Sequence, residues 1–229
     1  VGTETLTNKT LTSPKINENV AVTSTATELN LLDGKAATNL ALLGKTEGTN
    51  FTGSLLVGHA THGTLNASSN NTGIGIGALD ALTSADDNVA VGNNAGTAIT
   101  TGNKNTFIGK NSGKTGSTNF GNVGVGFESL FNTQSSGVYN TAIGMQAGYG
   151  VNTGDYNVFL GYQAGKNVSS GSGNVVIGNA NVSTASGDDQ LLISDGEDGS
   201  VVWISGDSSG NLVTPGTITA NSVVLTGVA

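Results

Sequence analysis

The chain has 229 residues, of which 36 are glycine and only 10% are charged, and it contains no cysteine. The lack of cysteine excludes a disulfide scaffold and a cysteine-ligated zinc site, and the formal net charge of −8 argues against nucleic-acid binding, which depends on lysine and arginine. No apolar run approaches the roughly 18 residues of a membrane-spanning helix, so we expect no membrane insertion. Abundant glycine and little charge predict a fold that turns often and regularly.

Residues 1–50 are predicted to form an attachment or shaft segment of extended chain and short helices. Apolar and polar residues alternate from Leu6 to Ile16, as in a strand. Thr25-Ala-Thr-Glu28 fits a helix-capping box, and a second short apolar run extends from Ala36 to Leu43. The chain begins with Val1 and not with Met, so we expect a processed product or part of a longer protein.

Residues 51–70 are predicted to be a linker that carries both histidines, His59 and His62. A His-x-x-His pair on an oligomer axis could bind a metal. Because no carboxylate lies beside the pair, a polar linker is the preferred interpretation, and no metal site and no cofactor are predicted.

Residues 71–187 contain a motif, Asn-(Thr/Val)-x-(Ile/Val/Leu)-Gly, that recurs seven times at a spacing of 17 or 18 residues. A repeat at a fixed short period is typical of a solenoid. We therefore predict an all-β fold, a parallel β-roll of seven rungs, each with two short strands and two turns. The repeated Asn and Gly residues are Asn71, Gly75, Asn88, Gly92, Asn105, Gly109, Asn122, Gly126, Asn140, Gly144, Asn157, Gly161, Asn174 and Gly178.

Each rung position, counted from the Asn as position 1, has an expected role. Stacked Asn side chains can form hydrogen-bonded ladders. Gly at position 5 suits a positive φ or a close backbone approach, and Ala or Ser at position 8 is small enough for a narrow coil. Positions 2 and 4 are expected to face the core of the coil, because strand side chains alternate.

Position 3 is then expected to point outwards, where small residues alternate with large apolar ones. The large members, Phe107, Phe159 and Val176, are the candidate interface of a homotrimer. Position 9 alternates Gly with Leu79, Leu130 and Val182, which is expected to add apolar surface. Exposed apolar stripes are typical of surfaces that associate.

The rungs from residue 71 to about 182 resemble the head repeats of trimeric autotransporter adhesins, and the same repeat type occurs in bacteriophage tail fibres. The resemblance implies a left-handed parallel β-roll in which three chains pack around a shared axis. The segments LTNKTLTSPKIN and TATELNLLDG also resemble segments of phage fibre and other virion proteins, which favours a phage over an adhesin.

Residues 188–229 are predicted to be a β-rich C-terminal segment. Residues 189–194 are expected to be a degenerate capping rung, because terminal repeats are often atypical. Short strands are predicted at 201–204, 210–213, 217–220 and 222–226, each bounded by Gly, Asp, Ser or Pro.

Glycine-rich, acidic and tyrosine patterns also have possible chemical interpretations. Residues 73–78 and 109–115 resemble nucleotide-binding glycine loops, but the first recurs in register with every rung and the second has the wrong spacing. The acidic pairs 86–87 and 188–189 and the cluster 195–199 could hold calcium, although turn residues with solvated charge are preferred. The tyrosines could stack on sugar, with packing as the alternative; they are Tyr139, Tyr149, Tyr156 and Tyr162.

No nucleophile, base and orienting group can be assembled from these residues, so no enzymatic activity is predicted. The expected function is a structural virion fibre, a phage tail fibre or other appendage, that projects a host-attachment surface. The expected partners are two further copies of the chain, other virion proteins, and a host glycan or protein. The alternatives are a bacterial surface adhesin head and a polysaccharide-cleaving tail spike.

Overall fold

The computed structural model describes residues 46–48, 51–58, 65–133 and 137–216. The chain divides into two compact units, 1–41 and 42–229. The first unit, the predicted helices and the histidine pair lie outside the described residues. The described part of the second unit is all-β, without a helix, and forms the predicted parallel β-solenoid with rungs of about 17 residues.

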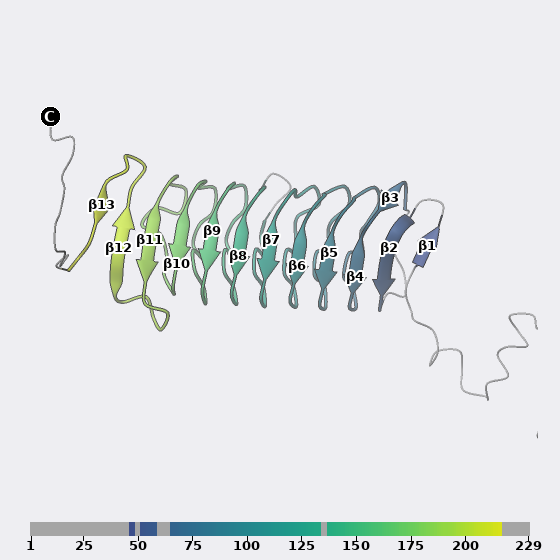
Figure 1. The fold of residues 1–229 in the computed structure, drawn as a ribbon, viewed down its shortest axis with the longest axis horizontal. Helices are drawn as coiled ribbons and strands as arrows, with labels where there is room; N and C mark the ends of the chain where they lie inside the picture. Colours follow the sequence, from purple (N-terminus) through teal and green to yellow (C-terminus); the bar gives the residue numbers. More distant parts are fainter. Residues whose placement is uncertain (1–45, 49–50, 59–64, 134–136, 217–229) are drawn as a thin grey trace, which may run out of the picture. The chain divides into compact units, whose positions relative to one another are not determined.

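The solenoid presents one sheet in which the strands follow chain order (Figure 1). Neighbouring strands pair in parallel and position for position, so Phe107 lies between Ala90 and Gly124. Each repeat holds one named strand of three residues and not the predicted two, because glycines and residues with positive φ fill the rest of the rung. The repeat strands are β4 (Thr72–Ile74), β5 (Val89–Val91), β6 (Thr106–Ile108), β7 (Val123–Val125), β8 (Thr141–Ile143), β9 (Val158–Leu160) and β10 (Val175–Ile177).

The coil begins one turn before the first repeat, within the predicted linker. Strand β1 (Thr46–Gly48) pairs antiparallel with β2 (Phe51–Val57), and β2 pairs in parallel with β3 (Ser68–Ser69) and β4. Ser54 takes the place of the Asn, since its Oγ accepts a hydrogen bond from the Asn71 amide at 2.7 Å. This rung has Ser54 where the motif has Asn, but it keeps the Gly of position 5 as Gly58, with φ 95°. A repeat pattern that begins with Asn therefore does not reveal it.

The coil ends with the degenerate rung that the sequence predicts. Strand β11 (Leu191–Ser194) pairs in parallel with β10. Gln190 replaces the Asn, and its backbone amide and Nε2 donate to Asn174 Oδ1 at 2.9 and 3.1 Å. The strands predicted at 201–204 and 210–213 are present as β12 (Val202–Gly206) and β13 (Leu212–Val213). They pair antiparallel and extend the sheet of the coil, whereas the sequence predicted a separate β-rich segment. The predicted strands beyond residue 216 lie outside the described residues.

The core of the coil is built from positions 3, 8, 9 and 12, which corrects the expected direction of the strands. Phe107, Phe159 and Val176 are fully buried inside the coil, so their side chains cannot form the predicted interface between chains. The buried Leu79, Leu130 and Val182 likewise add to the core and not to the surface. Large and small residues alternate at positions 3 and 9, which suggested a second apolar surface. In the structure, this alternation instead matches side-chain volumes inside the core of one chain.

Within a rung, a phenylalanine at position 3 is paired with a glycine at position 9, and a glycine at position 3 is paired with a leucine at position 9. Where position 3 is Phe107, position 9 is Gly113; where position 3 is Gly124, position 9 is Leu130. The ring of Phe107 also reaches the neighbouring rungs, because a Cβ on Gly124 would lie 3.0 Å from it. Close packing requires such compensation, since interiors contain few voids.

The buried Asn side chains form the predicted ladder. In one step of this ladder, Asn88 donates from both its backbone amide and Nδ2 to Asn71 Oδ1, each at 3.0 Å. Asn88 Nδ2 also donates to the Gly102 carbonyl at 2.8 Å, which ties the start of the rung to its return side. The same bonds recur along the rungs, so the ladder satisfies polar groups that have no access to water.

Gly at position 5 meets both expectations for that position. Gly92 has φ 132°, and a Cβ there would lie 2.7 Å from the carbonyl of Gly109 in the next rung. The chain therefore turns at the end of each strand at a point where successive backbones are in contact.

Candidate functional site: the outer faces of the coil

One outer face of the coil is the exposed side of the strands, formed by positions 2 and 4. The sequence predicted that these positions face the core, but side chains alternate along a strand, so the inward position 3 turns them outwards. Ile74, Ile108, Ile143 and Leu160 are between 40% and 46% exposed. We call positions 2 and 4 of the seven repeats the strand face.

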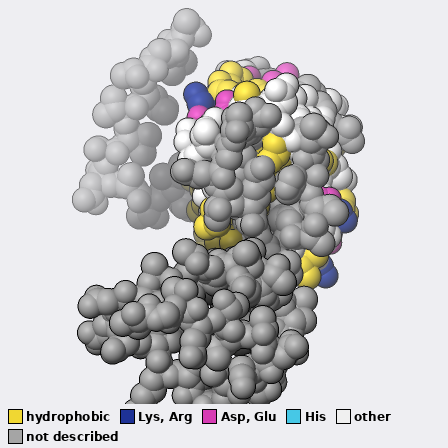
Figure 2. Space-filling model, turned by 90° about the vertical axis from the view of Figure 1, so that its right-hand side faces the viewer, with side chains coloured by type: hydrophobic (Ala, Val, Ile, Leu, Met, Phe, Trp, Pro, Cys, Tyr) yellow, Lys and Arg dark blue, Asp and Glu magenta, His cyan; other side chains and the backbone are white. Residues whose placement is uncertain are grey.

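No charged side chain interrupts the strand face. Its position-2 residues are Thr72, Val89, Thr106, Val123, Thr141, Val158 and Val175, and its position-4 residues are Ile74, Val91, Ile108, Val125, Ile143, Leu160 and Ile177. Seven rungs about 4.8 Å apart give the face a length of roughly 30 Å. In a view along the coil, hydrophobic, acidic and basic side chains all appear on the visible described surface (Figure 2).

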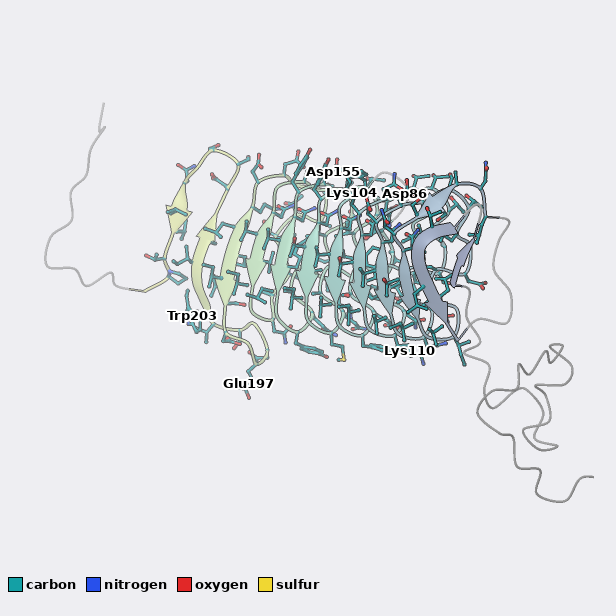
Figure 3. All side chains as sticks on the ribbon, turned by 45° about the vertical axis from the view of Figure 1, so that its right-hand side comes forward. Asp86, Lys104, Lys110, Asp155, Glu197 and Trp203 are labelled. Atoms are coloured by element: carbon teal, nitrogen blue, oxygen red, sulfur yellow. The ribbon has the colours of Figure 1, made fainter. Side chains whose placement is uncertain are left out.

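A column of aromatic side chains stands at the edge of the coil where the strands begin. Lys104 Nζ lies 5.4 Å from the centre of the Phe120 ring. Phe120 meets Tyr139 edge to face at 5.4 Å, and Tyr139 stacks on Tyr156 at 5.1 Å with an angle of 14° between the rings. We call these four residues the corner stack. Lys104 lies on the same edge of the coil as Asp86 and Asp155, and Lys110 lies on the opposite edge (Figure 3).

A second aromatic column lies at position 10, which we call the position-10 stack. Phe131 and Tyr149 stack at 5.0 Å with an angle of 11°. A lysine covers each end, with Lys114 Nζ 5.4 Å from the Phe131 ring and Lys166 Nζ 5.9 Å from the Tyr149 ring. Stacked rings with an ammonium over the face are a favourable arrangement.

The four tyrosines therefore do not form the single patch considered from the sequence. Tyr139 and Tyr156 belong to the corner stack, Tyr149 to the position-10 stack, and Tyr162 to position 6. Tyr162 is exposed in the same column as Phe127 and Met145. The position-6 and position-10 columns are built from residues 17 or 18 apart in sequence, which is the spacing of the Asn repeat. In the corner stack, Phe120 departs from this spacing, because it lies one residue before the position that Lys104, Tyr139 and Tyr156 share.

The acidic cluster 195–199 is an ordered turn between β11 and β12. Asp195 Oδ1 accepts hydrogen bonds from the amides of Glu197, Asp198 and Gly199, and Oδ2 accepts one from Val201 at 2.7 Å. The bond from Val201, followed by that from Gly199, holds the pKa of Asp195 below its usual value. The Asp195 carboxylate therefore stabilises the turn, as expected if the acidic residues are turn residues.

The other acidic and glycine-rich patterns belong to rungs. Asp86 Oδ1 and Asp188 Oδ1 each accept a hydrogen bond from the backbone amide of the preceding rung, both at 2.7 Å. The segment 109–115 is a rung turn, and its Lys110 and Lys114 occupy separate columns, positions 6 and 10. Among the described residues, no three His, Asp or Glu side chains gather into a metal-binding group.

A cavity of about 550 Å³ lies at the C-terminal end of the coil. Its lining includes Val182, Leu192, Val202 and Val213. The cavity forms because β12 and β13 extend the sheet but do not continue the rest of the rung. It is thus the end of the coil's own core.

Within the part of the chain that the structure describes, no helix has the length and apolar character needed to cross a bilayer. Comparison with protein-family models, with curated proteins and with solved structures finds no match to this chain.

Proposed function

We propose that this protein is a non-catalytic, rigid segment of a virion fibre, such as a phage tail fibre or another appendage, that projects a host-attachment surface. The coil is compatible with this role, because each rung is hydrogen-bonded to the next through the sheet and the Asn ladder. A rod stabilised in this way resists bending, since every rung contacts its neighbours along the whole length.

The proposal includes assembly into a homotrimer through the strand face. The observation that carries it is that positions 2 and 4 are uncharged over seven consecutive rungs, are mostly aliphatic with three threonines, and are half-exposed or exposed. Contiguous apolar surface of this kind is typical of an interface. The number of three chains comes from the resemblance to trimeric fibre repeats, whereas the face itself comes from the packing of the coil.

Native mass tests the assembly. Light scattering on the purified chain is expected to give a mass near three times 22.7 kDa. The double variant I143K/L160K places two charges in the strand face, so it is expected to lower the mass to that of one chain while the circular dichroism spectrum is retained. A monomeric wild-type protein contradicts the trimer, and a trimeric double variant contradicts the strand face as its interface.

A matched control places the same two charges elsewhere on the same rungs. Thr153 and Ser170 both occupy position 14 and are exposed. The variant T153K/S170K is expected to keep the mass of the wild type, which separates an effect of the strand face from an effect of added charge.

The virion assignment needs a separate test, because a bacterial adhesin head uses the same type of coil. Antibodies against the chain are expected to label appendages of purified phage particles in electron micrographs. Labelling of the bacterial surface in cells that carry no phage favours the adhesin instead.

A further inference from the structure

Both aromatic stacks begin with a lysine ammonium over a phenylalanine ring, and they differ at the other end. In the position-10 stack, a lysine ammonium covers each outer ring face. In the corner stack, Lys104 covers the Phe120 end, but no lysine covers Tyr156 in the described residues. Tyr156 is 62% exposed, more than its stacking partner Tyr139 at 46%.

The next two rungs leave space over the open face of Tyr156. The equivalent position in the following rung is Gly173, which has no side chain, and the one after that is Asp189. The backbone amide of Gly173 donates to the Asp155 carbonyl at 2.9 Å, and that of Asp189 to the Ser172 carbonyl at 2.8 Å, so the three residues follow one another along the edge of the coil.

The Asp189 carboxylate leans back into this space. A Cβ built on Gly173 would collide with Asp189 Oδ1, so the carboxylate lies over the glycine. Side chains of this column lean the same way elsewhere, since a Cβ on Gly121 would lie 2.8 Å from the Tyr139 ring. The Asp189 carboxylate is exposed and has no hydrogen-bond donor among the described residues.

We propose that Tyr156, Gly173 and Asp189 form a binding site for an organic ammonium group. Two rung spacings separate the Tyr156 and Asp189 positions by about 9.6 Å. An ammonium that lies about 5 Å from the ring centre is then within ion-pair distance of the carboxylate. The bound group completes the corner stack as Lys166 completes the position-10 stack.

The chemistry of the site favours a cation over a neutral ring such as a sugar. The negative face of the tyrosine ring and the carboxylate both attract positive charge. Asp155 and Asp188 lie in the adjacent column of the same edge and strengthen the negative field. The site belongs to a single coil, so the inference goes beyond the proposed fibre function and does not depend on the trimer.

Titration with choline and with its neutral isostere, 3,3-dimethylbutan-1-ol, tests the proposal on the full chain. The ring signals of Tyr156 are followed by NMR in protein labelled at tyrosine, at constant ionic strength. Choline is expected to shift these signals at concentrations at which the isostere does not. A third arm with butylammonium separates a quaternary group from a primary, lysine-like one, and binding of either cation supports the site.

Two variants locate the site. Tyr156→Leu keeps the bulk but removes the π face, and it is expected to weaken cation binding about five-fold. Asp189→Asn keeps the shape and suits the positive φ of 53°, and it is expected to weaken binding by a similar factor that shrinks as salt is raised. In the Tyr156→Leu variant, binding is followed through the signals of Tyr139.

The control variant Tyr149→Leu alters the position-10 stack, whose two faces are already covered, and is expected to leave cation binding unchanged. The proposal is overturned if neither cation shifts the Tyr156 signals, if the neutral isostere binds as well as choline, or if Tyr156→Leu binds choline like the wild type.

Discussion

The ring of Phe107 occupies the space beside the α-carbon of Gly113: a Cβ on that glycine would lie 2.5 Å from three of the ring carbons. Gly113 also has φ 59°, in the left-handed region that side chains disfavour. The close contact follows from the exchange of volume between positions 3 and 9, which lets a narrow coil hold a phenylalanine. The positive φ is a property of position 9 itself, since Leu130 also has a φ of 48°.

Replacement of Gly113 by alanine is therefore expected to destabilise the coil. The strain at positive φ costs about 1 kcal/mol, and overpacking against the Phe107 ring adds about 1–3 kcal/mol. Chemical denaturation measures the loss in the free energy of unfolding. Gly196→Ala is the control, because a Cβ at Gly196 has no atom within 4 Å, and its effect is expected to be small.

The double variant F107G/G113L tests the volume exchange directly, since it gives this rung the Gly and Leu that rung 122–139 already has at Gly124 and Leu130. The two changes compensate in volume, so their combined cost is expected to be smaller than the sum of the single costs. Leucine at a positive φ is tolerated at Leu130, where φ is 48°. If the losses in the free energy of unfolding of the two single variants add up to that of the double variant, the pairing of positions 3 and 9 is contradicted.

Removal of one Asn from the middle of the ladder is expected to be costly. Asn140 Oδ1 accepts bonds from the amide and Nδ2 of Asn157 at 3.0 and 2.9 Å, and Asn140 Nδ2 donates to the Gly154 carbonyl at 2.8 Å. Asn140→Ala leaves these buried groups unpaired, at about 1–3 kcal/mol for each. Thermal unfolding compares it with Asn152→Ala in the same rung, where the side chain is exposed and little change is expected.

Asn119 offers the opposite case, a substitution that is expected to stabilise the protein. Its side chain is fully buried, and neither Nδ2 nor Oδ1 has a hydrogen-bond partner. Equivalent positions hold Ala85 and Gly102. Asn119→Ala is expected to raise the free energy of unfolding by about 1–3 kcal/mol, because it removes an unpaired buried amide. A lower midpoint of denaturation contradicts this interpretation.

Acid is expected to loosen the turn between β11 and β12. Because hydrogen bonds to the ionised carboxylate lower the pKa of Asp195 in the folded state below 3.8, the stabilisation is present above pH 3.8 and is lost as the pH falls through the folded value. Hydrogen exchange at the Val201 amide reports the opening. Asp195→Asn removes the charge at every pH, so its Val201 amide is expected to exchange faster near neutral pH and to lose the acid dependence. Unchanged exchange in this variant contradicts the role of the carboxylate.

The repeat could be predicted from the sequence because its signals are local. Gly92 needs a positive φ at the end of its strand, and Asn88 needs a partner of the same kind one rung away; both requirements recur at a fixed spacing that a single sequence displays. The parallel coil, the Asn ladder and the degenerate rung at Gln190 follow from that spacing. The all-β class follows as well, because β-branched residues and glycine dominate the rungs.

Only the tertiary structure decided which side of the strand is inside. Positions 2 to 4 alternate, so either side can face the core, and the choice depends on whether Phe107 finds space beside Gly96, Gly113 and Gly124 in three different rungs. The same holds for the rung at Ser54, which lacks the Asn of the motif, and for the open face of Tyr156 above Gly173. The sequence determined the period of the coil through local backbone requirements, whereas the core, the strand face and the ammonium site arise from contacts between side chains that only the closed coil brings together.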